Sequence, residues 1–111
     1  MVDKTVVNCV RHYLKTVNET GIRVTFGVIF GSHARGEAAV ESDVDVMVVS
    51  PEFDGERKLG DVAKLWKCAA KSEENIEPIA CGEQQWTEDE GTPIIEVARQ
   101  QGQIVRLYGG D

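Results

Sequence analysis

Between residues 24 and 49 the sequence reads VTFGVIFGSHARGEAAVESDVDVMVV. Residues 24–30 and 44–49 are rich in β-branched and aromatic side chains, which predicts two buried strands. The first strand runs directly into Gly31 and Ser32. Because Gly31 has no Cβ, a ligand can approach the backbone closely at this turn. The stretch therefore predicts a strand, a phosphate-binding turn and a second strand in succession.

Asp43 and Asp45 stand at the start of the second apolar run. Side chains alternate between the two faces of a strand, so both carboxylates are expected on one face and the valines at 44, 46 and 48 on the other. Two Asp residues on one face repel each other unless a cation lies between them, and Mg²⁺ prefers oxygen ligands. We interpret the pair as a metal site; the alternative is the exposed edge of a half-buried strand.

Three short motifs lie in order between the two apolar runs: Gly31-Ser32, Ala34-Arg35-Gly36 and Ser42-Asp43-Val44-Asp45. This order resembles the nucleotidyltransferase superfamily that includes DNA polymerase beta, and most closely its smallest branch, the minimal nucleotidyltransferase (MNT) domain. Ser32 and Asp43 are eleven positions apart, which is the usual family spacing. The resemblance implies an α/β (α+β) nucleotidyltransferase fold, in which a small mixed β-sheet carries helices packed mainly on one side.

The resemblance also implies Mg²⁺-dependent nucleotidyl transfer, in which a nucleoside triphosphate is attacked at its α-phosphorus and releases pyrophosphate. Two Mg²⁺ ions would be held by the catalytic carboxylates Asp43 and Asp45. The family normally has a third carboxylate on a later strand, which helps to bind the metal and can activate the nucleophile. We assign this role to Glu77, in the candidate strand at residues 75–80; the alternative is an outward-facing strand residue.

The phosphates are expected at the turn between the two strands. The backbone amides after Gly31 and the Ser32 hydroxyl would bind the β- and γ-phosphates, with help from the N-terminus of a short helix near Ala34; an ordinary turn is the alternative. Arg35 offers a fork-shaped donor for phosphate, with a surface ion pair as the other reading. We interpret His33 as structural rather than as a general base, because a lone His is usually structural.

Within the resemblance, the acceptor of the nucleotide is often a protein side chain. MNT domains of this size are commonly the antitoxin partner of a HEPN-domain ribonuclease, and some attach AMP from ATP to a tyrosine of that toxin. The resemblance thus implies an adenylyltransferase-like enzyme with a HEPN-type protein partner. Two alternatives stay open: a non-catalytic module that neutralises its partner by occlusion, and a nucleotide sensor that binds ATP and Mg²⁺ without turnover.

Length and charge narrow the choice of partner. The chain has 111 residues and a formal net charge of −7, which predicts one domain over residues 1–111 and argues against a broad nucleic-acid surface. No apolar run reaches the ~20 residues that span a bilayer, and no signal peptide is recognised, so a cytoplasmic protein without membrane contact is expected. A domain this small gains stability from a protein partner or from a second copy in a homodimer.

The remaining segments follow helix and strand periodicities. Helices are expected over residues 3–20, 34–38, 56–72 and 93–101, strands over 22–30, 43–50, 75–81 and 103–108, a turn over 51–55 and a loop over 83–90. Pro78 places the third strand at a sheet edge. Trp66 is expected in the core, and Trp86 as a loop anchor or partner contact. Three cysteines without metal-type spacing are read as reduced, buried thiols, namely Cys9, Cys68 and Cys81.

Overall fold

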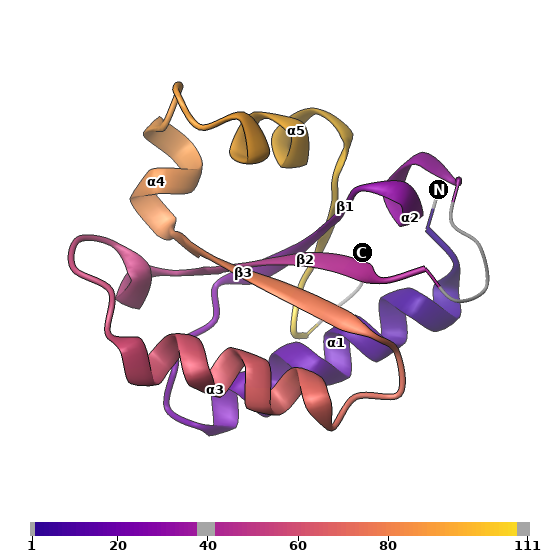
Figure 1. Cartoon of the computed structure of the whole chain (residues 1–111), viewed down its shortest axis with the longest axis horizontal. Helices are drawn as coiled ribbons and strands as arrows, with labels where there is room; N and C mark the ends of the chain where they lie inside the picture. The colour runs from indigo at the N-terminus through magenta and orange to yellow at the C-terminus, as the bar shows by residue number, and fades with distance from the viewer. Residues whose placement is uncertain (1, 38–41, 109–111) are drawn as a thin grey trace.

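The computed structural model describes residues 2–37 and 42–108, and these form a four-stranded mixed sheet with helices on both faces (Figure 1). The helices are α1 (Lys4–Glu19), α2 (Ser32–Arg35), α3 (Leu59–Ala70), α4 (Glu83–Glu88) and α5 (Pro93–Gln101), with a 3-10 turn at Pro51–Phe53. The strands are β1 (Phe26–Phe30), β2 (Val44–Ser50), β3 (Ile76–Gly82) and β4 (Gln103–Val105). The predicted α/β (α+β) class is confirmed.

The sheet has the strand order β3-β2-β1-β4. Strand β1 runs antiparallel to both of its neighbours, whereas β2 and β3 are parallel. The long connection between β2 and β3 contains α3, as a parallel pair requires. Strand β3 is an edge strand, which confirms the prediction from Pro78, because proline cannot donate a ladder hydrogen bond.

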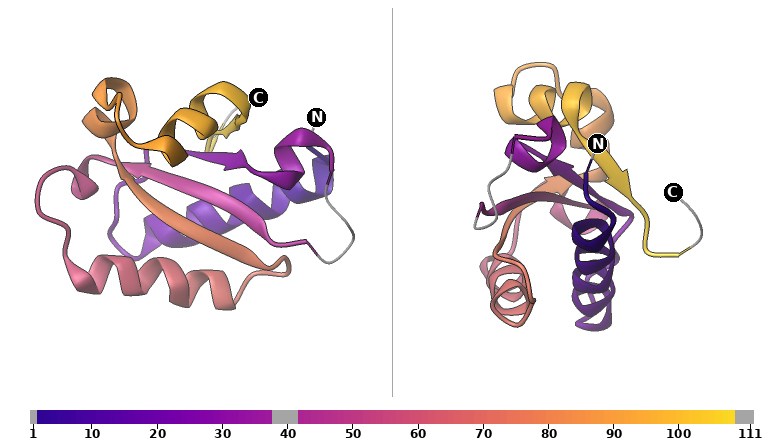
Figure 2. Two further views of the ribbon diagram at one scale, coloured as in Figure 1. Left: turned by 45° about the horizontal axis from the view of Figure 1, so that its top comes forward. Right: turned by 90° about the vertical axis from the view of Figure 1, so that its right-hand side faces the viewer.

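The helices form two unequal layers. The two longest helices, α1 and α3, lie side by side on one face of the sheet (Figure 2). The shorter α4 and α5 cover the opposite face, and α2 lies on that same side (Figure 2). The prediction of helices mainly on one side therefore describes the two long helices, while the second face has a thinner cover. We call the two sides the α1–α3 face and the α5 face.

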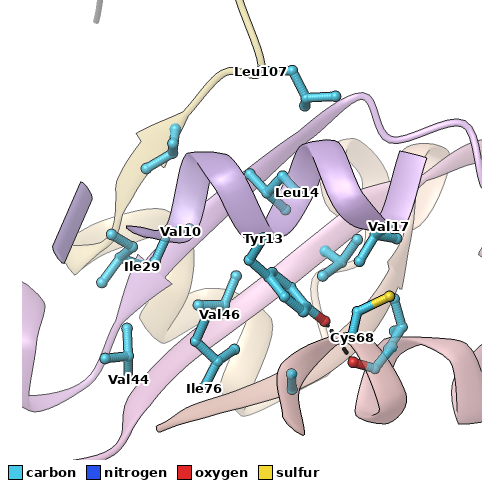
Figure 3. Close-up of a cluster of buried hydrophobic side chains, with 14 of the residues drawn as sticks. Val10, Tyr13, Leu14, Val17, Ile29, Val44, Val46, Cys68, Ile76 and Leu107 are labelled. Carbon is cyan, nitrogen blue, oxygen red and sulfur yellow. Dashed lines mark hydrogen bonds between the residues drawn. The ribbon is translucent and has the colours of Figure 1, made fainter. Parts of the chain in front are cut away.

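The larger apolar cluster fills the space between the sheet and the two long helices (Figure 3). Helix α1 contributes Val10, Leu14 and Val17, each fully buried. The hydroxyl of Tyr13 donates a 2.9 Å hydrogen bond to the carbonyl of Leu65 in α3. Burial raises the pKa of Tyr13, so this phenol is a neutral donor that joins the two helices.

A smaller apolar cluster lies under α5. It consists of Val28, Phe30, Met47, Val49, Cys81, Ile95 and Ala98. Burial raises the pKa of Cys81 to about 11, which makes this thiol unreactive. Cys68 is also buried, whereas Cys9 is only partly so, and all three cysteines are free thiols.

The observed ends of α1 and α5 agree with the predicted ends to within one residue. The side chain of Asp3 caps α1 by accepting a 2.7 Å hydrogen bond from the amide of Thr5. Helix α5 spans the predicted residues with Pro93 at its first position. Thr92 occupies the cap position but makes no side-chain cap there; its hydroxyl donates instead to Asp89, at 2.8 Å.

The prediction of a loop over residues 83–90 is wrong, because Glu83–Glu88 form α4. Its N-terminal amides are capped from outside the segment: Asp54 accepts hydrogen bonds from the amides of Gln84, at 3.0 Å, and Gln85, at 3.2 Å. The local part of the cap is a 3.1 Å hydrogen bond from the amide of Gly82 to the side chain of Gln85, and the cap from Asp54, thirty residues away, leaves no signal within the segment. Trp86 therefore lies on a helix, where its ring meets the ring of Phe26 edge-on, with the two ring centroids 5.7 Å apart.

Other boundaries were predicted too wide, and one burial prediction was wrong. Strands β1 and β4 are shorter than expected, and α3 begins at Leu59 rather than at residue 56. Trp66 is 51 % exposed, not part of the core. The short helix starts earlier than predicted, at Ser32, and Gly36 ends it in the left-handed conformation; residue 38, its predicted end, lies outside the described residues.

None of the described helices combines the length and apolar character that crossing a membrane requires.

Candidate active site

The turn after β1 brings the backbone against an acidic side chain. Gly31 has φ +76° and ψ −148°, a conformation that essentially only glycine adopts. A Cβ at this position would collide with the Asp45 carboxylate. The first turn of α2 follows at once, and its amides have no acceptor within the helix. Gly31 thus lets the start of α2 approach the carboxylate closely, as its predicted role requires.

The three predicted carboxylates lie at one end of the sheet, where β1 ends and β2 and β3 begin. Val44, Val46 and Val48 point into the α1–α3 core, so the alternation along β2 places Asp45 on the α5 face. Glu77 is the direct partner of Asp45 across the parallel β2–β3 ladder. Neighbours in register point to the same face, so the structure brings the predicted third carboxylate next to the pair.

Neighbouring carboxylate charges raise the pKa of Glu77 and of Asp45. The charge of Asp43 is the largest cause of the raised pKa of Glu77, with a hydrogen bond to Asp43 and the charge of Asp45 adding to it. Burial, and then the charge of Asp43, raise the pKa of Asp45. A hydrogen bond from Glu77 and the positive charges at His33 and Arg35 oppose this rise. The cluster therefore holds more negative charge than its surroundings balance.

The donor set suits a hard divalent cation. Carboxylate oxygens are the ligands that Mg²⁺ prefers, and a cation would relieve the repulsion among Asp43, Asp45 and Glu77. Among the residues that the structure describes, no three His, Cys, Asp or Glu side chains form a complete metal-binding group as they stand. Asp43, Asp45 and the exposed Glu77 stay candidate ligands on the chemistry of their oxygens.

Asn75 and His33 make contacts at this site that were not expected from the sequence. The side-chain amide of Asn75 donates a hydrogen bond to Oδ1 of Asp43, and the Asn75 carbonyl accepts from the amide of Val44 at 2.9 Å. The spacing of two between Asn75 and Glu77 was the available signal, because residues i and i+2 share a strand face. Nε2 of His33 lies 3.2 Å from the carbonyl oxygen of Ser42. The structural reading of His33 agrees with this link between α2 and the start of β2.

The two predicted phosphate ligands on α2 are accessible. Ser32 is partly exposed at the start of the helix. Nε of Arg35 lies 3.2 Å from Oε2 of Glu37, and its side chain is 42 % exposed. The ion pair weighed for Arg35 therefore exists, yet the same guanidinium also lowers the pKa of Asp45. Because exposed ion pairs are weak, Arg35 can exchange Glu37 for a phosphate.

Solved structures share the fold at low sequence identity. A protein from Sulfolobus solfataricus that is provisionally assigned as a nucleotidyltransferase aligns with a TM-score of 0.63 and 18% identity, over 88% of this chain and 77% of that one. A toxin–antitoxin structure with AMP-PNP aligns with a TM-score of 0.58 and 17% identity, over 90% of this chain and 73% of that one. At these identities the comparison shows a common fold. A comparison with curated proteins finds no match.

The sequence itself matches a family model. The model describes a nucleotidyltransferase domain, and the match extends over residues 10–102. This range contains β1, the Gly31 turn, β2 and β3, and with them each candidate site residue. Because the match covers most of the 111 residues, the chain belongs to the nucleotidyltransferase domain family, within the DNA polymerase beta-like superfamily.

Proposed function

We propose that this protein transfers a nucleoside monophosphate, AMP from ATP, to a hydroxyl group of a partner protein. The observation that carries the proposal is the placement of Asp43, Asp45 and Glu77 on one face of the sheet, beside the turn at Gly31. Family membership supports the class of reaction. In the proposed reaction a bond forms between the acceptor oxygen and the α-phosphorus, the α–β phosphoanhydride bond breaks, and pyrophosphate leaves.

Each site residue has a role in this reaction. Asp43, Asp45 and Glu77 would hold Mg²⁺, as two ions, which when bound supplies positive charge for the reacting phosphate oxygens. The amides at the start of α2 and the Ser32 hydroxyl bind the β- and γ-phosphates, and Arg35 adds a charged donor. A carboxylate oxygen of Glu77 accepts the proton of the acceptor hydroxyl, a task that its raised pKa favours.

The biological setting we propose is a toxin–antitoxin pair, with a tyrosine of a HEPN-type toxin as acceptor. Support comes from the shared fold with a toxin–antitoxin structure that contains AMP-PNP. The acidic chain, with a net charge of −7, also suits a protein partner better than a nucleic acid. Attachment of AMP would inactivate the toxin covalently.

A labelling experiment tests the proposal. The purified chain is incubated with ATP labelled at the α-phosphate, with Mg²⁺, and with or without the protein encoded beside it. The Asp43→Ala/Asp45→Ala double variant runs in parallel, and Glu73→Gln, an exposed acid outside the site, is the matched control. Label on the partner that disappears only in the double variant supports the proposal.

Two other outcomes contradict it. Tight complex formation and toxin neutralisation without label, unchanged in the double variant, would mean that the protein acts by occlusion. Saturable ATP binding without pyrophosphate release or label would mean a nucleotide sensor. Pyrophosphate release is therefore measured in the same reactions.

A further inference from the structure

Helix α3 carries an apolar stripe that faces solvent. Leu59 is 86 % exposed and Trp66 is 51 % exposed, and Ala63 and Ala70 are exposed as well. At 3.6 residues per turn these four positions lie within an arc of about 60°. Single exposed apolar residues are ordinary, but a line of them along one helix marks an interaction surface.

The stripe is separate from the face with which α3 packs on the protein. Leu65, Cys68 and Ala69 are the residues that α3 buries against the core. Figure 2 shows α3 at the margin of its layer, with the sheet above it and α1 on one side only. The sequence pattern of α3 therefore contains two apolar faces, and only one of them is used by the described part of the chain.

Lysines line one side of the stripe. Lys64, Lys67 and Lys71 lie about 100° around the helix from it. Lys64 lies 4.0 Å from a carboxylate oxygen of Asp61 and donates to the carbonyl of Thr20. Lys67 and Lys71 are exposed and form no ion pair with the described residues. A protein with a net charge of −7 thus places, next to its exposed apolar helix face, positive charges that pair with none of the described acids.

These charges decide between candidate occupants. In a two-fold pair of α3 helices centred on the stripe, the lysine-bearing sides of the two copies would lie on the same flank of the contact, and like charges in such positions repel. The negative net charge disfavours an anionic lipid surface. An amphipathic helix with Leu-type residues on one face and Asp or Glu beside them satisfies both the stripe and the lysines.

We propose that the exposed face of α3, formed by Leu59, Ala63, Trp66 and Ala70 with Lys67 and Lys71, docks an acidic amphipathic helix of a partner protein. The contact is independent of nucleotide transfer, because α3 covers one face of the sheet and the carboxylates lie on the other. A partner docked on α3 leaves Asp43 and Asp45 accessible, so the chain can hold a partner while the site reacts.

Binding of labelled helical peptides to the full chain tests this surface. Three peptides of about 18 residues share one apolar face and differ in its flanks, which carry Glu, Gln or Lys. Fluorescence anisotropy gives the affinity of each peptide. We expect the Glu peptide to bind about tenfold or more tightly than the Lys peptide, and the difference to shrink at high salt.

Variants locate the contact on α3. Leu59→Ser/Trp66→Ser should weaken binding of the Glu peptide about tenfold or more, and Lys67→Glu/Lys71→Glu should reverse the preference towards the Lys peptide. All four positions are exposed, so the variants keep the fold, which circular dichroism checks. The matched control is Ile94→Ser/Val97→Ser, which changes two exposed apolar residues of α5 and should bind like the natural sequence.

Other results overturn the proposal. Peptide binding that is absent, or that ignores the flanking charges or the Leu59/Trp66 variant, excludes an acidic helix as the occupant. Self-association in sedimentation that disappears in Leu59→Ser/Trp66→Ser would assign the face to a second copy. Binding to phosphatidylserine vesicles that depends on the same residues would assign it to a membrane. Asp43→Ala/Asp45→Ala should bind the Glu peptide normally. The docking proposal can therefore be tested even if the proposal of nucleotide transfer fails.

Discussion

Strand β2 shows how differently the two faces of the sheet are built. On the α1–α3 face, Val44, Val46 and Val48 are buried along the whole strand. On the α5 face, Met47 and Val49 are buried under α5, but the same row begins with Asp45. The first row is apolar until Ser50, which ends the strand, and the second changes from apolar to acidic where β1 ends. The apolar packing of the first face can therefore stabilise a fold whose second face carries unfavourable negative charge.

The sharpest way to test this division is to remove charge from the α5 face. Asp45→Asn should reduce nucleotide transfer about a thousandfold, because a site that holds cations stabilises the transition state by several kcal/mol. Burial and the charge of Asp43 both raise the pKa of Asp45, so its loss of charge should leave the free energy of unfolding unchanged or higher. Label transfer and urea unfolding measure the two effects; a variant that is both active and destabilised would contradict the division.

Substitutions in the core of the α1–α3 face should have the opposite effect: they should lower stability and leave activity unchanged. Leu14→Ala removes a fully buried side chain from the larger cluster and should lower the free energy of unfolding by about 3–5 kcal/mol. Ile95→Ala, its counterpart under α5, should cost about 2–3 kcal/mol because the smaller cluster leaves more room to relax. Neither variant should change the activity of the folded fraction. A larger cost for Ile95→Ala, measured by urea unfolding, would reverse the ranking of the two faces.

The same contrast explains what the sequence alone could predict. The positions of Asp43, Asp45 and Glu77 follow from the period of two along a strand and from the order of motifs, and both are local properties of the chain. The structure pairs Asp45 with Glu77 across β2 and β3, and Asp43 lies directly before β2. The roles of these residues stay predictions.

Features that depend on distant contacts could not be predicted in this way. The first amides of helix α4 are capped by Asp54, which lies outside the segment, and within it only Gln85 contributes, by accepting from the amide of Gly82. The apolar residues of α3 cover two sides of the helix, so their periodicity did not show that Leu65 faces the core and Trp66 faces solvent. In both cases tertiary packing determines the structure and overrides what the local sequence pattern predicts.

Two glycines that flank α2 offer a matched test of the site's geometry. Both have positive φ, but a Cβ at Gly31 would meet the Asp45 carboxylate, whereas a Cβ at Gly36 would have no described atom within 4 Å. Gly36→Ala should therefore cost only the backbone strain, about 1 kcal/mol. Gly31→Ala should cost about 2–3 kcal/mol, since glycine alone adopts its conformation, and should also lower transfer activity by displacing Asp45. Equal activity in the two variants would show that the close approach at Gly31 has no catalytic role.

Asn75 provides a weaker perturbation of the same face. Its amide donates to Asp43, and residues that orient metal ligands in this way typically contribute about 10- to 100-fold to metal affinity or activity. Asn75→Ala should reduce transfer about tenfold with little loss of stability, because the backbone bond between Asn75 and Val44 remains. Asn75→Asp should be less active still, since it adds a carboxylate to an already repulsive cluster. Transfer rates at several Mg²⁺ concentrations separate weakened metal binding from slower chemistry; wild-type rates in Asn75→Ala would exclude the positioning role.

The smallest effect is expected in the turn between α4 and α5, the helices that cover the α5 face of the sheet. A hydrogen bond from the Thr92 hydroxyl, together with bonds from the amides of Thr92 and Gly91, lowers the pKa of Asp89. The folded state therefore favours the charged carboxylate of Asp89. This charge contributes its full stabilisation above the ordinary Asp pKa of 3.8. The stabilisation is lost as the pH falls through the lowered pKa of Asp89 in the folded state. Asp89→Asn should thus be slightly less stable than the natural sequence at pH 7, and the difference should shrink in acid. Urea unfolding at both pH values, with Glu90→Gln as a matched loss of one acid from the same turn, checks the sign; a difference that grows on acidification would mean that the turn does not depend on the charge of Asp89.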